Sequence, residues 1–143
     1  MTVFLDSSAL VKRYANEPES DVVQAVSEPV IASDLAAVEV PAALWRKHRV
    51  GEISATDAQV LCRRFLTDVS ASTRDSDTVL IEVGEDILRS AIDLVARHPL
   101  RAYDAVQLAS ALAASRLIGR CPFGCFDEQL TDAAVAEGLM LLW

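Results

Sequence analysis

The stretch Met1-Thr2-Val3-Phe4-Leu5-Asp6-Ser7-Ser8 decides the fold of this chain. Thr2 to Leu5 have the composition of a short buried strand, because β-branched and aromatic residues dominate them. The strand ends on Asp6, and two small hydroxyl residues lead from it into a helix. Ligands of open α/β sheets bind at the carboxyl ends of the strands. The sequence therefore predicts a carboxylate at the ligand-binding edge of a sheet.

Strands and helices alternate along the rest of the chain, which is typical of a parallel sheet covered by helices on both faces. Asp34 is suited to cap a helix, the segment 54–57 is predicted to open another, and the polar segment 72–77 is predicted to be a loop. The pattern favours an α/β fold of three layers with a mostly parallel sheet of four to five strands, the first of them central. The predicted strands are 2–5, 29–33, 78–83, 121–126 and 139–143, and the predicted helices are 8–14, 18–27, 35–49, 54–70, 85–97, 101–117 and 131–137.

The length of 143 residues and the hydrophobic content of 52% suit one globular domain over 1–143. No run is apolar enough to span a membrane, and the N-terminus has no basic segment before its apolar residues. We therefore expect a soluble, cytoplasmic protein. The three cysteines, Cys62, Cys121 and Cys125, are expected to be reduced and small buried residues, since a zinc site would need further ligands.

The net charge of −8 by itself counts against a nucleic-acid partner, because domains that bind nucleic acids usually carry basic patches. Two details weaken this objection. A cluster of acids that holds cations is neutralised by them, and most cationic residues here are arginines, which are suited to bidentate contact with phosphate. The grouped cations also fit ordinary solvated helix faces. They are Lys12-Arg13, Arg46-Lys47-His48-Arg49 and Arg63-Arg64.

Four acids lie in apolar surroundings: Asp6, Glu39, Asp104 and Asp127. Isolated carboxylates in apolar runs are costly unless something compensates their charge. One shared divalent cation would compensate all four, and Mg²⁺ prefers such oxygen ligands. Asp6 and Asp127 each follow a predicted strand, and the other two lie in predicted helices that can reach the same edge of the sheet.

Each acid also has a purely structural interpretation. Asp6 fits a turn at the end of a strand, and Glu39 fits the exposed side of a helix. Asp104 fits a helix N-terminus, where a negative charge is favourable, and Asp127 fits an N-cap. Ser7 and Ser8 could likewise cap the first helix, or hydrogen-bond a phosphate or a metal-bound water.

Four features together resemble the PIN domain family, and specifically the VapC-like toxins of toxin–antitoxin pairs. They are VFLDSSALVKRY (3–14), an acid in the helix after the second strand, YDAVQLASAL (103–112) and FDEQLTDAAVAEGL (126–139). The resemblance covers essentially the whole chain. It implies a Mg²⁺- or Mn²⁺-dependent endoribonuclease that cleaves structured RNA, such as tRNA or ribosomal RNA, and so blocks translation. It also implies a homodimer and a cognate antitoxin that covers the site.

The resemblance also assigns roles to the acids. Asp6 resembles the first metal ligand, Glu39 the helix-borne second acid and Asp104 the third acid. Asp127 resembles the fourth acid, which contributes less directly, and Ser8 is similar to a small hydroxyl residue near the site. Family members often carry Thr or Ser two residues before the fourth acid, whereas this chain has Cys125, whose thiol is a poorer hydrogen-bonding group.

Two other functions remain open from the sequence. A phosphotransfer domain could use Asp6 as its nucleophile, but such sites usually need a second acid very close to the first and a lysine late in the chain. Here Ser8 follows at that position and no lysine comes after Lys47. A catalytically silent PIN-like binding module would carry the same acids without activity. A nucleotide-binding module is disfavoured, because no glycine-rich loop follows the first strand.

Overall fold

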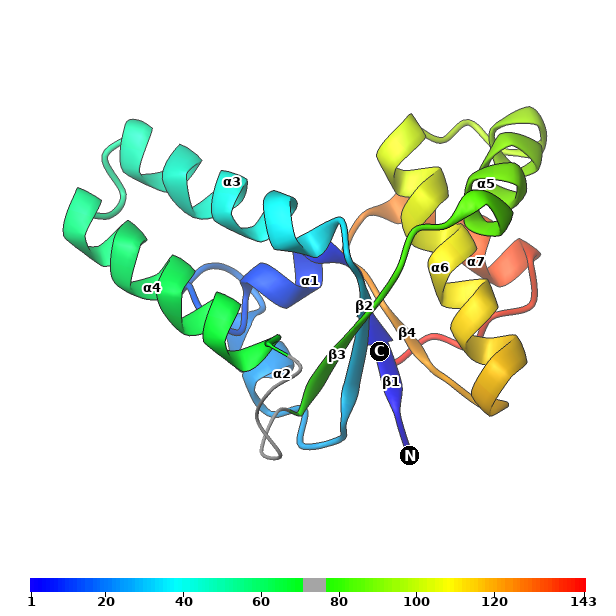
Figure 1. The fold of residues 1–143 in the computed structure, drawn as a ribbon, viewed down its shortest axis with the longest axis horizontal. Coiled ribbons are helices and arrows are strands. Elements are labelled where there is room, and N and C mark those ends of the chain that lie inside the picture. Colours follow the sequence, from blue (N-terminus) through cyan, green and yellow to red (C-terminus); the bar gives the residue numbers. More distant parts are fainter. Residues whose placement is uncertain (71–76) are drawn as a thin grey trace.

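The computed structural model describes residues 1–70 and 77–143 and is organised around a four-stranded parallel sheet of order β3-β2-β1-β4 (Figure 1). The first strand therefore has a neighbour on each side, as the sequence predicts. Phe4 is in register with Ile31 of one neighbour and with Phe123 of the other. The strands are β1 (Val3–Leu5), β2 (Val30–Ser33), β3 (Thr78–Ile81) and β4 (Phe123–Gly124).

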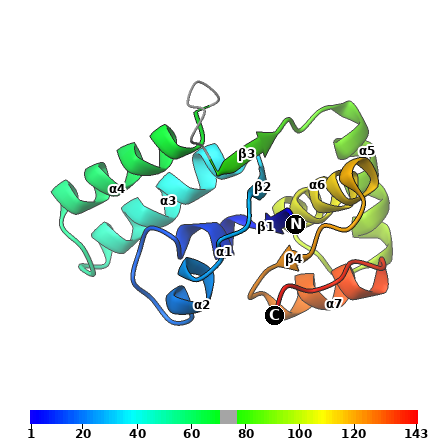
Figure 2. The ribbon, with the colours of Figure 1, turned by 90° about the horizontal axis from the view of Figure 1, so that it is seen from below.

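Helices cover both faces of the sheet, so the predicted three-layer α/β/α architecture is confirmed (Figures 1 and 2). One layer contains α1 (Ser7–Val11), α2 (Ser20–Gln24), α3 (Ala36–Arg49) and α4 (Ala55–Asp68). The other contains α5 (Glu85–Arg97), α6 (Ala102–Ile118) and α7 (Glu128–Ala136). In Figure 1 the paired helices α3 and α4 extend away from the sheet as an arm.

Alternating side chains of β1 supply both hydrophobic cores, because successive residues of a strand point to opposite faces. Val3 and Leu5 pack with residues of α1, α3 and α4, including Leu44 and Phe65. Phe4 packs with residues of α5, α6 and α7 on the other face. All three β1 side chains are fully buried, and burial of each such side chain stabilises the fold by about 1.5–3 kcal/mol. The end of β1 is therefore a rigid position for Asp6.

The C-terminal strand predicted over 139–143 is wrong, because this segment contributes only one isolated bridge, between Leu141 and Phe123. The ring of Trp143 stacks on Phe126 at 4.7 Å between centroids, and its Nε1 donates to the Cys125 carbonyl oxygen at 3.1 Å. Because β4 spans only Phe123–Gly124, the pairing is limited to the hydrogen bonds between Phe123 and residues Met140 and Leu142. The sheet consequently has four strands among the described residues.

Several predicted helix ends also differ. The first helix ends at Val11 rather than at residue 14, because the following turns tighten to hydrogen bonds between residues three apart. The second begins at Ser20 rather than at residue 18, since Glu19 has a left-handed backbone with φ of 62°. The helix predicted over 131–137 begins earlier, at Glu128. Asp34 does not cap α3, whose first residue follows Leu35 without a side-chain cap.

Three further expectations concern the chain as a whole. Within residues 1–70 and 77–143, no helix is long and apolar enough to cross a membrane. The three cysteines are free thiols, and two of them are buried whereas Cys62 is partly exposed. The loop is predicted over 72–77, and residues 72–76 of it lie outside the described part of the chain.

Candidate functional site

Asp6 is the buried centre of the site. It follows β1 and caps α1, so that its Oδ1 accepts a 2.8 Å hydrogen bond from the Ala9 backbone N–H. The Ser8 hydroxyl lies 2.8 Å from Oδ1 and 2.9 Å from Oδ2, and the Cys125 thiol lies 3.3 Å from Oδ2. Only 4% of Asp6 is exposed. The local residues Ser8 and Ala9, together with the distant Cys125, therefore hold both carboxylate oxygens at the carboxyl end of β1.

Burial raises the pKa of Asp6 to about 6, because removal from water penalises the charged form. Hydrogen bonds from Ala9, Ser8 and Cys125 oppose this change, and the nearby charge of Glu39 reinforces it. No ion pair among the described residues involves Asp6. A cation beside this carboxylate would relieve the cost of its charge.

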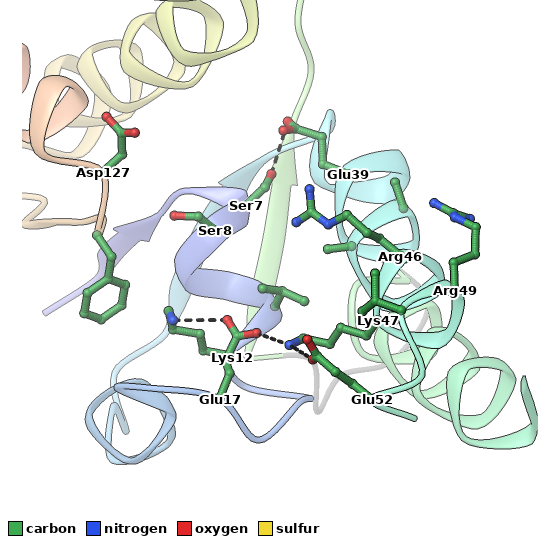
Figure 3. A pocket seen from close by; sticks show the side chains of 15 residues that line it. Ser7, Ser8, Lys12, Glu17, Glu39, Arg46, Lys47, Arg49, Glu52 and Asp127 are labelled. Carbon is green, nitrogen blue, oxygen red and sulfur yellow. Dashed lines mark hydrogen bonds and ion pairs between the residues drawn. The ribbon is translucent and has the colours of Figure 1, made fainter. Parts of the chain in front are cut away.

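Glu39 approaches Asp6 from the first turn of α3, on the same helical layer as α1. Its Oε1 accepts hydrogen bonds from the Ser7 hydroxyl at 3.2 Å and from Gln107 Nε2 at 2.9 Å. Figure 3 shows Ser7 pointing from α1 toward this carboxylate. Partial burial raises the pKa of Glu39, the two hydrogen bonds lower it, and the charge of Asp104 raises it. Glu39 is therefore a tethered residue of the site rather than a freely solvated helix acid.

The remaining two acids come from the other helical layer. Asp104 lies in the first turn of α6, as predicted, and Asp127 caps α7 through a 2.8 Å hydrogen bond from the Leu130 N–H. Burial raises the pKa of Asp104, and the neighbouring charge of Asp127 raises it further, while Arg101 lowers it. Asp127 is itself exposed. The N-cap role suggested for Asp127 is thus real, and it coexists with proximity to Asp104.

The four acids form one series of electrostatic neighbours, from Asp6 to Glu39, from Glu39 to Asp104 and from Asp104 to Asp127. In the described part of the chain, no group of three or more His, Cys, Asp or Glu side chains is arranged to hold a metal ion by itself. The structure therefore brings the acids to one edge of the sheet without gathering them as a closed ligand set.

The donor set nevertheless fits a hard divalent cation. All four side chains are carboxylates that no ion pair between described residues neutralises. Three of them carry raised pKa values, which burial and mutual repulsion cause. Mg²⁺ usually keeps several waters and needs only one or two carboxylates from the protein. An open acidic site of this kind suits such an ion better than it suits zinc.

A groove of about 840 Å³ extends along α3, and two of the four acids, Glu39 and Asp127, line it. Glu39, Ala42, Ala43 and Arg46 lie on one face of the helix at the spacing of helical neighbours. Arg46 and Arg49, seven and ten residues after Glu39, also line the groove. Figure 3 shows Asp127 across the site from Glu39, with Ser7 and Ser8 between them.

The two lysines play a different part from these arginines. Lys12 and Lys47 both pair with Glu17, at 3.1 Å and 2.6 Å, and only 8% of Lys12 is exposed. Arg46 and Arg49 are exposed and form none of the ion pairs found between the described residues. Lys47 therefore also lines the groove but has its charge paired, whereas Arg46 and Arg49 line it without an ion pair to a described residue.

Four side chains at the site have contacts that the sequence does not predict. Ser7 and Ser8 do not cap α1, since Asp6 does, and their hydroxyls bind the carboxylates of Glu39 and Asp6 instead. Cys125 is buried, as expected, but its thiol contacts Asp6 rather than serving only as an apolar group. Gln107 was not singled out, although a glutamine between Val106 and Leu108 in an apolar helix is a signal of a buried polar contact.

Known proteins are similar to this chain over most of its length. A family model described as PIN domain matches residues 3–118. Ribonuclease VapC46 from Mycobacterium tuberculosis is 32% identical over 143 aligned positions, which cover 98% of this chain and 95% of the relative. Ribonuclease VapC49 from the same species is 36% identical over 117 positions, which cover 78% of this chain and 75% of the relative.

Two solved structures share the fold at low sequence identity. FitAcB from Neisseria gonorrhoeae superposes with a TM-score of 0.65 at 15% identity, covering 99% of this chain and 96% of that chain. A toxin–antitoxin complex from Klebsiella pneumoniae gives a TM-score of 0.59 at 17% identity, covering 89% and 88%. The family match spans most of the sequence, and the resemblance noted from the motifs agrees with it. The chain belongs to the PIN domain family.

Proposed function

We propose that this chain is a divalent-cation-dependent endoribonuclease toxin that cleaves structured RNA, tRNA or ribosomal RNA, and so blocks translation. The observation that carries the proposal is the buried, unneutralised carboxylate of Asp6 at the carboxyl end of β1, with Glu39 as its electrostatic neighbour and Asp104 and Asp127 next in the series. Relatives named as ribonucleases support the reaction class. A toxin–antitoxin complex with the same fold supports the biological role.

Asp6, Glu39 and Asp104 would hold the Mg²⁺ or Mn²⁺ ion, and Asp127 would complete or support the cluster. When bound, such an ion supplies Lewis acidity, which lowers the pKa of water and offsets charge on the phosphodiester. The protein needs no side-chain nucleophile for this reaction. Ser8 holds both oxygens of Asp6 in place, and Ser7 does the same for Oε1 of Glu39.

The proposal is tested with purified protein and structured RNA. We expect cleavage in the presence of Mg²⁺ or Mn²⁺, and its loss when EDTA removes the ion. Restoring an excess of either ion should restore cleavage, because removing the ion leaves the fold intact. If the protein cuts RNA equally well in EDTA, the cation-dependent mechanism is wrong. If folded protein never cuts RNA with either ion, the catalytically silent binding module becomes the better description.

Arg46 and Arg49 are the residues we assign to the RNA backbone. They lie about 10 and 15 Å along α3 from Glu39, given a rise of 1.5 Å per residue, and they line the same groove. Arginine is suited to phosphate, and backbone contacts dominate the salt dependence of nucleic-acid binding. The overall negative charge of −8 is therefore compatible with two exposed arginines on the α3 side of the groove.

Replacing both arginines with alanine is expected to raise KM for RNA severalfold and to leave kcat within about twofold. The logarithmic dependence of KM on salt should become shallower by about 0.7–0.9 for each phosphate that the variant no longer neutralises. The matched control is Arg89→Ala, since Arg89 lies on α5 in the other layer and pairs with Glu85. An unchanged salt dependence in the double variant would show that Arg46 and Arg49 do not contact the RNA phosphates.

Further parts of the proposal concern organisation and partners. We propose that residues 1–143 form one domain, since helices from both halves of the chain cover the same sheet. We also propose a cognate antitoxin, a homodimer and a cytoplasmic place of action, which the family resemblance and the RNA substrate favour. The phosphotransfer alternative is weakened, because both lysines are paired with Glu17 away from Asp6.

A further inference from the structure

Gln107 connects the two helical layers at the site. It lies on α6, three residues after Asp104, and only 2% of it is exposed. Its Nε2 lies 2.7 Å from the Ser7 hydroxyl on α1 and 2.9 Å from Oε1 of Glu39 on α3. One amide group therefore contacts two other elements that carry the site.

The chemistry of the groups fixes the direction of these hydrogen bonds. A carboxylate only accepts, so the glutamine must present its NH₂ group to Glu39. Ser7 accepts from Gln107 and uses its own hydrogen to donate to Glu39, at 3.2 Å. Among the hydrogen bonds of the described residues, those to Glu39 therefore all end on Oε1. This arrangement orients the carboxylate and leaves Oε2 for another ligand.

The carbonyl oxygen of the same amide group does not hydrogen-bond to the site. Oε1 of Gln107 is buried and has no hydrogen-bond partner among the described residues. Buried polar atoms are normally paired, and an unpaired one calls for an explanation. The surrounding helix is apolar, so a methionine would suit the packing at this position better than a glutamine with one unsatisfied oxygen. The NH₂ contacts to Glu39 and Ser7 supply the explanation.

We propose that Gln107 is a positioning residue, which holds Glu39 and Ser7 in the orientation that binds the divalent cation. The proposal rests on the function proposed above. Residues that hydrogen-bond to metal ligands orient them, and their loss typically costs about 10–100-fold in metal affinity. Gln107 does not touch the reacting atoms, so its effect is on the affinity for the ion and not on the chemistry once the ion is bound.

Gln107→Met tests this role, because it removes the amide and keeps a similar side-chain length. Mn²⁺ binding is measured without RNA, from the electron paramagnetic resonance signal of free Mn²⁺. We expect binding about 10–100-fold weaker than in the parent protein. RNA cleavage should then require correspondingly more Mn²⁺, while kcat at saturating Mn²⁺ returns to within a few-fold of the parent. Thermal unfolding in EDTA should be unchanged or shifted to a higher temperature.

Ser110→Ala is the matched control. Ser110 lies one turn further along α6, is fully buried, and has a hydroxyl without a partner among the described residues. Its substitution also removes a buried polar group from the same helix, but not one that contacts an acid of the site. We expect parental Mn²⁺ affinity for this variant.

Parental Mn²⁺ affinity in folded Gln107→Met protein would overturn the inference while leaving the proposed function intact. Absence of Mn²⁺ binding and of cleavage in the parent protein would instead overturn both. If Gln107→Met does not fold, Gln107→Asn serves in its place, because it retains the amide but withdraws it by one methylene. Weakened Mn²⁺ binding by folded Gln107→Asn supports the inference, and parental binding overturns it.

Coupling with Ser7 gives a second measurement. Ser7→Ala removes one of the two donors to Glu39, so we expect a smaller loss of Mn²⁺ affinity than in Gln107→Met. Residues of one hydrogen-bond network have non-additive effects. The double variant should therefore bind Mn²⁺ about as weakly as Gln107→Met alone. Fully additive losses would mean that Gln107 and Ser7 act independently, which contradicts the proposed network.

Discussion

Asp6→Asn is expected to lower RNA cleavage at least about 100-fold while the protein folds as before. Loss of a residue that only hydrogen-bonds to a metal ligand typically lowers metal affinity or activity about 10–100-fold. Asp6 is proposed to contact the ion directly, so its loss should cost more. Asparagine is as good an N-cap as aspartate, so the hydrogen bond from Ala9 to the side-chain oxygen is retained. Its NH₂ group can also face Ser8 or Cys125. The substitution therefore removes the charge and little else.

The same variant should be more stable than the parent in EDTA at pH 7.5. Burial raises the pKa of Asp6 from 3.8 to about 6, so ionised Asp6 destabilises the folded state. This penalty is on the order of 3 kcal/mol and is fully present about one pH unit above the folded-state pKa, as at pH 7.5. It shrinks as the pH falls through the folded-state pKa, because folded protein then takes up the proton first. Below pH 4 the difference should have vanished.

Unfolding in urea at pH 7.5 and at pH 4 measures this difference. Added Mn²⁺ gives an independent control, since an ion that binds only the folded state stabilises it. We expect Mn²⁺ to stabilise the parent protein and to stabilise Asp6→Asn far less. If the variant cleaved RNA at the parental rate, the assignment of Asp6 as the central metal ligand would be wrong.

Local sequence signals account for much of the fold. The helix predicted over 85–97 has those bounds in the structure, and the segment 54–57 that is predicted to open a helix forms a capping box between Ser54 and Asp57. The end of β1 at Asp6 was also predicted, because a buried run that stops on an acid is a strong signal. Each of these features depends on neighbouring residues, so the sequence alone is sufficient.

Contacts between distant segments account for what was missed. The segment 139–143 forms only an isolated bridge because its partner β4 has two residues, and no local pattern encodes that shortness or the stacking of Trp143 on Phe126. Helical periodicity places Glu39 on a helix but does not reveal that Ser7 and Gln107 orient it. Likewise, an N-cap signal at Asp127 says nothing of the charge of Asp104 beside it. The acids could be identified from the sequence, whereas the groups that orient them required the structure.

The other large effect is expected from Asp104→Asn, with Asp127→Asn as its graded counterpart. Asp104 is partly buried between Glu39 and Asp127, and the charges of these two neighbours are coupled to it. We expect Asp104→Asn to lower RNA cleavage at least about 100-fold and to weaken Mn²⁺ binding. We expect a loss of only about tenfold from Asp127→Asn, because that carboxylate is exposed and is proposed to act at the margin of the cluster.

Both substitutions are chemically identical and both lie at helix N-termini, so their structural costs are comparable. Asparagine preserves the cap of α7, and the loss of a negative charge near a helix N-terminus costs about 0.3–1 kcal/mol. Glu128→Gln is the control, because it removes an exposed charge next to Asp127. Initial cleavage rates and Mn²⁺ titrations of the three variants give the order of their effects. Equal losses of cleavage in Asp104→Asn and Asp127→Asn would indicate that both acids contact the ion directly. A parental cleavage rate in Asp104→Asn would mean that Asp104 is not a metal ligand.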